Sequence, residues 1–147
     1  MSNFLNISQI KSVFKTMGEK LKVSHTVFCV EETSAIKRMK EKNGVCLLVC
    51  YPSFVRVGGQ DNFSGKNALM IWVLEKGKVN SGTGTDDDDD AQMSTLQYTV
   101  TDVLNYMDEQ CSKGCTVFSA MMPEFTQVNP EYNQFGGYNG WQIEIIL

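Results

Sequence analysis

The spacing of apolar residues predicts two long helices. Over residues 3–22 the apolar side chains recur every three or four positions, and Asn6 with Gln9 fits a capping box at the start. The same period returns after a run of aspartates and predicts a second helix from about Asp89 to Ser112, with Gly114 as its stop signal. The apolar positions are Ile7, Ile10, Phe14, Met17 and Leu21 in the first helix, and Met93, Leu96, Val100, Val103, Leu104 and Met107 in the second.

Runs that are apolar at every position predict strands that are buried on both faces. Val45–Val57 begins Val-Cys-Leu-Leu-Val-Cys-Tyr, and Lys66–Lys76 is apolar at both its odd and its even positions. We expect these two strands, joined by a loop over Gly58–Gly65, to form the antiparallel centre of a sheet. His25–Val30 predicts a further short strand, and the charged segment Glu31–Lys42 predicts a short helical piece.

The end of the chain predicts a β-hairpin with a long connection. An apolar run over Cys115–Val128 and the alternating strand Trp141–Leu147 flank the polar loop Asn129–Gly140. This loop is rich in Asn, Gln, Gly and Tyr, a composition typical of adaptable contact surfaces. The candidate interface side chains in it are Tyr132, Phe135 and Tyr138.

Together these elements predict an α+β fold, a mostly antiparallel sheet of four to five strands with two long helices packed on it. The 147 residues contain no internal repeat and no linker, so we expect a single domain over 1–147. No apolar run approaches the roughly 20 residues that cross a bilayer, and we expect no contact with a membrane.

Residues 77–90 predict an acidic surface loop, because small polar residues are followed there by a charge run that cannot form a core. We interpret the aspartates as solvated residues that also favour the start of the following helix. The candidates for an acidic surface are Asp86, Asp87, Asp88, Asp89 and Asp90.

Alternate aspartates of this run, Asp86, Asp88 and Asp90, match the first three ligand positions of a calcium loop. The match then fails, since Ala91 stands where the turn glycine belongs and Gln97 where the bidentate glutamate belongs. A loosely held divalent cation is the alternative to the solvated segment.

No constellation of residues supports an enzyme. His25 is the only histidine, and the glycine-rich stretches fit neither a phosphate-binding loop nor a dinucleotide fingerprint. The five cysteines are interpreted as buried reduced thiols, none in surroundings that mark a reactive nucleophile. We therefore expect no catalysis and no cofactor, and the alternative is an enzyme with an acidic metal site built on Asp86–Asp90.

Charge is distributed unevenly along the chain. Residues 1–57 carry nine Lys or Arg and four acids, a net charge of +5, whereas residues 58–147 carry four Lys and thirteen acids, a net charge of −9. Such halves are either solvated surface or complementary faces of neighbouring subunits. Lys11 and Lys15 are the interface candidates from the basic half.

The order of elements resembles that of tailed-phage neck and tail-end proteins, the tail completion or tail terminator group. The resemblance covers the helix at 3–22, the strand pair at 45–75, the helix near 89–112 and the closing hairpin. The ending Tyr132–Leu147 is also similar to the ends of phage-derived structural proteins.

This resemblance implies a non-enzymatic virion protein, made in the host cytoplasm, that forms a ring, commonly a hexamer, between the connector and the tail tube. The implied partners are further copies of the chain, other tail or connector proteins, and DNA that passes without specific binding. Aspartates that line the channel would repel the DNA phosphates. The alternative is a cytoplasmic α+β domain that binds a protein or a small ligand.

Overall fold

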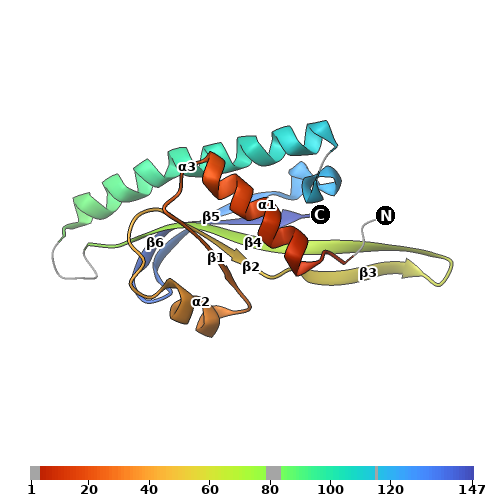
Figure 1. Cartoon of the computed structure of the whole chain (residues 1–147), viewed down its shortest axis with the longest axis horizontal. Helices are drawn as coiled ribbons and strands as arrows, with labels where there is room; N and C mark the ends of the chain where they lie inside the picture. Colours follow the sequence, from red (N-terminus) through yellow and green to blue (C-terminus); the bar gives the residue numbers. More distant parts are fainter. Residues whose placement is uncertain (1–3, 79–83, 115) are drawn as a thin grey trace.

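Helices and one mixed sheet make up the described residues, 4–78, 84–114 and 116–147, of the computed structural model (Figure 1). The helices are α1 (Ile7–Lys20), α2 (Glu32–Met39) and α3 (Asp86–Lys113), with the short 3₁₀ turns η2 (Val117–Ala120) and η3 (Pro123–Phe125). The strands are β1 (His25–Cys29), β2 (Cys46–Cys50), β3 (Ser53–Gly59), β4 (Asn62–Lys76), β5 (Gln127–Gln134) and β6 (Tyr138–Ile146).

The sheet is mostly antiparallel, and the α+β prediction is confirmed. Its strand order is β1-β2-β4-β6-β5, with β1 parallel to β2 and β3 paired to β4 beside that path. The described residues form six strands rather than four to five, because the predicted strand Val45–Val57 is divided into β2 and β3. Pro52 lies at the division, where it has no N–H to donate to a ladder.

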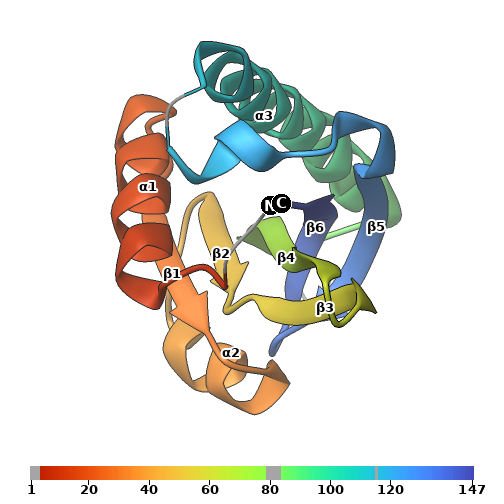
Figure 2. The ribbon, with the colours of Figure 1, turned by 90° about the vertical axis from the view of Figure 1, so that its right-hand side faces the viewer.

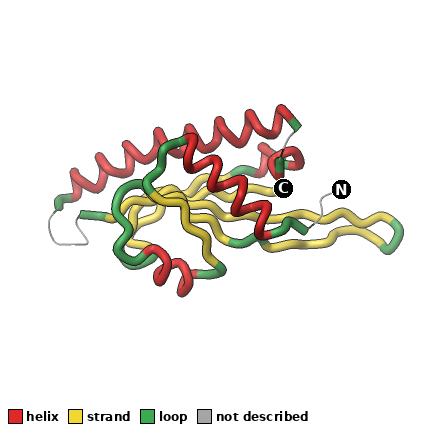
Figure 3. Tube along the Cα trace, viewed as in Figure 1, coloured by secondary structure: helices red, strands yellow, loops and turns green. Residues whose placement is uncertain are grey.

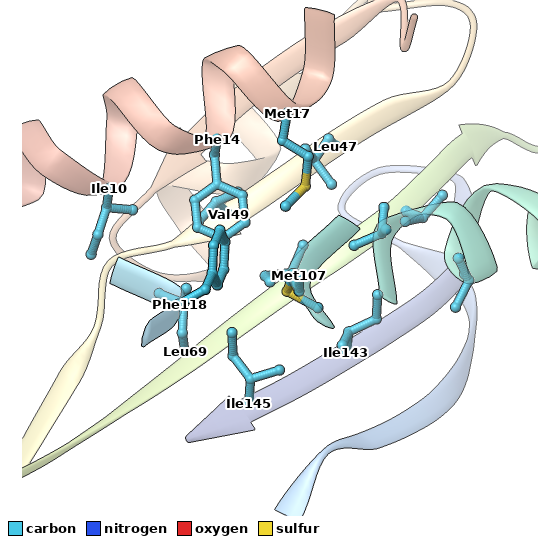
Figure 4. Packing of buried hydrophobic residues seen from close by; sticks show 14 of the residues in the cluster. Ile10, Phe14, Met17, Leu47, Val49, Leu69, Met107, Phe118, Ile143 and Ile145 are labelled. Atoms are coloured by element: carbon cyan, nitrogen blue, oxygen red, sulfur yellow. The ribbon is translucent and has the colours of Figure 1, made fainter. Parts of the chain in front are cut away.

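Two layers of helices cover the sheet. Figure 2 shows α1 and α3 on one face and α2 on the other. Phe14 from α1 meets Phe118 from η2 edge to face, with the ring centroids 5.6 Å apart, and this pair caps the larger cluster (Figure 4). The cluster also holds Ile10, Met17, Leu47, Val49, Leu69, Ile71, Val73, Leu96, Val100, Val103, Met107, Ile143 and Ile145. The predicted apolar stripes of α1 and α3 are thus mostly the buried faces.

A smaller cluster lies under α2. Trp72 and Leu74 of β4 point to this side, while Leu69, Ile71 and Val73 point to the larger cluster. Both faces of β4 are therefore buried in this region, as the uninterrupted apolar run predicts. The remaining members are Val27, Cys29, Ala35, Met39, Cys46, Leu48, Phe135 and Tyr138.

Two of the interface candidates, Phe135 and Tyr138, are buried in the described structure, with side chains only 9% and 1% exposed. The expected loop Asn129–Gly140 is mostly strand, and the connection between β5 and β6 is confined to residues 135–137. Gly140 is predicted to end the loop but lies in β6, where a Cβ would stand 1.9 Å from the Val73 carbonyl oxygen. This glycine permits close contact between strands and does not mark a loop.

Tyr138 connects β6 to the C-terminal end of α2. Its hydroxyl lies 2.5 Å from the Met39 carbonyl oxygen and 2.8 Å from that of Lys42, so the hydroxyl proton is shared between two acceptors. We predict that Tyr138→Phe lowers the free energy of unfolding by about 1–2 kcal/mol, because buried carbonyls lose their donor. Urea unfolding followed by circular dichroism measures this loss.

The matched control is Tyr98→Phe on α3, whose side chain is 76% exposed. It should leave the midpoint of unfolding unchanged. Equal effects of the two substitutions would show that the hydroxyl of Tyr138 does not hold α2 in place.

Candidate interaction surfaces

The hairpin of β3 and β4 projects from the body of the molecule (Figure 3). From Val55 paired with Lys66 to Gly59 paired with Asn62, the two strands pair only with each other among the described residues. The β6 ladder on β4 starts at Ala68. At ~3.4 Å per residue these five pairs extend roughly 15 Å. We call residues 55–66 the arm.

The arm presents apolar side chains to solvent. Val55 is 59% exposed and Val57 is 48% exposed, and the two lie on one face because strand side chains alternate. Met70, 41% exposed, continues this face toward the body. Within the part of the chain that the structure describes, β3 pairs with β4 alone, so its outer edge has no strand partner there. An open edge beside exposed valines is a surface that accepts another chain.

The root of the arm is held firmly. The Phe4 ring stacks on Phe54, with centroids 5.1 Å apart and planes 8° apart. The buried Asn67 accepts the Leu5 N–H on its Oδ1 at 3.0 Å and exchanges backbone hydrogen bonds of 2.8 and 2.9 Å with Leu147. Both ends of the described chain thus fix the strand from which the arm extends, and the arm has a defined direction.

The second surface is the start of α3, at the opposite end of the molecule from the arm (Figure 1). The aspartates are not loop residues, because α3 begins at Asp86 rather than Asp89. The Thr85 hydroxyl accepts the Asp88 N–H at 3.3 Å, and the Asp88 carboxylate accepts the Thr85 N–H at 2.9 Å. This capping box and the favourable helix dipole place the charge run inside the helix. Of the predicted loop 77–90, residues 79–83 lie outside the described part.

The helical conformation does not bring together the three aspartates of the calcium-loop match. Positions two apart on a helix point about 200° from each other, so Asp88 faces away from Asp86 and Asp90. Asp88 is also engaged in the cap. Within residues 4–78, 84–114 and 116–147, no group of three or more His, Cys, Asp or Glu residues is arranged to hold a metal ion.

An acidic hollow of about 560 Å³ lies between the start of α3 and β5. Tyr132, 53% exposed, lies at this hollow. The pKa of its phenol is raised, mainly by partial desolvation and to a smaller extent by the negative charge of Asp89. Asp89 itself is buried and accepts a hydrogen bond from Asn139 Nδ2 at 3.3 Å. The lining residues are Asp86, Asp89, Asp90, Met93, Pro130, Glu131 and Tyr132. Of the three loop residues predicted for an interface, Tyr132 alone keeps an exposed side chain.

The two lysine candidates of α1 differ in their surroundings. The Lys11 ammonium lies 5.9 Å above the centre of the Phe28 ring, in a cation–π contact, and the side chain is half-buried. Lys15 is exposed. The basic and acidic halves of the sequence do not form separate faces, because β3 from the first half pairs along its length with β4 from the second.

An apolar groove of about 670 Å³ lies where the start of α1, η2 and the end of the chain meet. Its apolar lining includes Leu5, Val13, Val117 and Leu147, with serine and asparagine side chains among them. No signal in the sequence indicated this groove, because its walls come from segments far apart along the chain.

No protein-family model, no curated protein and no solved structure matches this chain. Within the described residues, no helix combines the length and the apolar character needed to span a membrane.

The cap of α3 can be tested by substitution. We predict that Thr85→Ala lowers the free energy of unfolding by about 1 kcal/mol, because the start of a 28-residue helix loses its N-cap acceptor. Thr101→Ala, at an exposed position within the same helix, is the control and should change stability by no more than about 0.5 kcal/mol. Urea midpoints that fall equally for both variants would contradict the capping role.

Proposed function

We propose that this chain is a non-enzymatic structural subunit that assembles with its own copies into a ring, of the tail terminator or tail completion kind found in the head–tail neck of phage particles. The arm is the observation that carries this proposal. A two-stranded hairpin without a core gains little stability of its own in water, so a neighbouring surface that covers the exposed valines would stabilise the arm. The element order from α1 to the closing hairpin supports the same class of protein.

A second copy of the chain is the partner that the charges favour. The arm carries Lys66 on the face of its valines and Arg56 on the opposite face, with one acid, Asp61, and the acidic hollow lies at the other end of the subunit. A basic, apolar arm that docks against an acidic hollow with Tyr132 at its rim makes a contact between two different surfaces of identical subunits. Such heterologous contacts produce a ring when the rotation between subunits closes, and a hexamer is one such closure.

The aspartates outside the hollow have a separate role in this proposal. Asp87 and Asp88 are exposed and do not line the hollow. Facing the channel of a ring, they would repel phosphates and let DNA pass between connector and tail tube without adhering. Lys15, exposed on α1, is available for contact with a neighbouring tail or connector protein. The subunit would be made in the host cytoplasm and end in the virion.

The arm contact predicts a charge-swap result. Lys66→Glu should weaken self-association at least about tenfold, since it places like charges together, and Glu131→Lys in the hollow should do the same. The double variant should recover most of the loss. Sedimentation velocity over a concentration series measures the association constant, and Thr101→Glu on α3 is the control that should leave it unchanged.

Two outcomes would contradict the arm contact. The first is a wild-type chain that stays monomeric at high concentration and also in a mixture with tail-tube protein. The second is a double variant that associates no better than either single variant. Tyr132→Ala provides a further check, because it should weaken association while circular dichroism shows a folded monomer.

The second candidate function is a binding domain for a small apolar ligand, and the groove between α1 and η2 is the observation that favours it. This groove combines apolar walls with a few polar groups, as small-molecule sites do. Val13→Trp would fill it, and binding of an apolar fluorescent dye that this variant abolishes would support the alternative.

A further inference from the structure

Two thiols stand side by side at the ends of β1 and β2. Cys29 and Cys50 are direct partners in the parallel ladder, although they lie far apart in the sequence. Paired strands run about 4.8 Å apart, and a disulfide spans Cα atoms about 4.4–6.8 Å apart. Both side chains point to the α2 side of the sheet, where they contact the smaller core cluster.

The environments of the two thiols differ. Cys29 is 1% exposed, whereas Cys50 is half-buried, with its Sγ 3.2 Å from the Val30 carbonyl oxygen. A hydrogen bond from the Cys29 thiol lowers the pKa of Cys50 to about 7, against the effect of desolvation, and the same bond raises the pKa of Cys29. Cys50 is both the more exposed thiol and the one with the lowered pKa, so it is the nucleophile of the pair.

Cys29 and Cys50 both line a cavity of about 370 Å³. Met70, Trp72 and Phe135 form its apolar part. Glu31, Glu32 and Glu131 are also among its lining residues. A small reagent without net negative charge fits this lining, whereas an anionic one is repelled.

We propose that Cys29 and Cys50 form a dithiol site, which a small neutral or cationic organic disulfide oxidises to a disulfide bond between β1 and β2. The argument for this site does not use the proposed assembly, because it rests on the ladder register and the cavity, although the cavity shares Met70 with the arm face and Glu131 with the acidic hollow.

The reaction consists of two exchange steps. The Cys50 thiolate attacks one sulfur of the reagent, the reagent S–S bond breaks, and the first small thiolate leaves with the electron pair. The thiolate acceptor for the Cys29 thiol is then gone, so the main cause of the raised pKa of Cys29 is removed. Cys29 loses its proton to the released thiolate, attacks Cys50 Sγ and expels the second small thiolate. Cys50 reacted as a thiolate and supplied no proton, so this second small thiolate takes its proton from water. Two thiols of the protein are oxidised and one reagent disulfide is reduced to two thiols.

The bond would form at the root of the arm. Cys50 is the last residue of β2, and only Tyr51 and Pro52 separate it from β3. The Tyr51 N–H already donates to the Cys29 carbonyl oxygen at 2.9 Å, so the backbone holds the two strand ends together before any bond is made.

Mass spectrometry of the whole chain tests the site. Reduced protein is treated with 2-hydroxyethyl disulfide, remaining thiols are alkylated, and tryptic peptides are mapped. The expected product has lost two hydrogen atoms, contains peptide 23–37 joined to peptide 43–56, and returns to free thiols with dithiothreitol. Peptide 43–56 holds Cys46 as well as Cys50, so the assay is repeated with Cys46→Ser, which should keep the link, and Cys50→Ser, which should lose it.

A digest that cleaves after Leu47 or Leu48 separates Cys46 from Cys50 in the wild-type chain, so the assignment holds even if Cys46→Ser fails to fold. A lasting mixed disulfide on Cys50, a link to Cys46 instead, or no reaction at all would overturn the proposal.

The reagent class is tested by rate. Cystamine, which is cationic, should react faster than oxidised glutathione, which is anionic, after each rate is divided by that of the same reagent with a small free thiol. We expect a ratio of at least about tenfold at low salt, falling as salt screens the three glutamates. Equal normalised rates would overturn the preference for reagents without negative charge.

Discussion

The burial of β4 on both faces is the constraint on which the rest of the structure depends. Its odd positions require one apolar layer and its even positions another, because side chains alternate along a strand. α1, η2 and α3 form the first layer, and α2 with the turn at Phe135 forms the second. β4 also needs a hydrogen-bonding partner on each edge, and β2 and β6 provide these.

The two layers do not cover the same length of strand. β4 has 15 residues, yet α2 covers only the part near Trp72 and Leu74. Beyond Asn67, β4 pairs only with β3 among the described residues, and the β3 side chains Val55 and Val57 stay exposed. The arm is therefore the uncovered end of the same strand that organises the core. This continuity gives the arm a rigid root, and rigidity lowers the entropic cost of ordering an interface.

At the end of the molecule opposite the arm, polar residues that composition assigns to surface loops make structural contacts instead. The aspartate run begins a helix, and one member, Asp89, enters the interior to accept a hydrogen bond from Asn139. Tyr138, next to Asn139, fixes α2 instead of meeting a partner. Residues that composition assigns to a flexible contact loop thus join α2, α3 and the sheet, and leave Tyr132 and the exposed carboxylates as the surface.

The sequence by itself determined the α+β class, the two helical stripes and the two-sided burial of β2 and β4, because periodicity reports directly on which faces meet apolar surroundings. It did not determine the element types near the end of the chain, where the predicted strand run Cys115–Val128 is mostly the turns η2 and η3 and the predicted loop after it is mostly strand. It also indicated the capping box of Asn6 and Gln9, a local interaction that the structure contains. Tertiary structure alone decided the strand register. Register places Gly140 against Val73, buries Tyr138, and brings Cys29 beside Cys50, although nothing in their spacing marks them as a pair. Pairing between distant segments depends on how whole layers pack, and a local pattern carries no record of that.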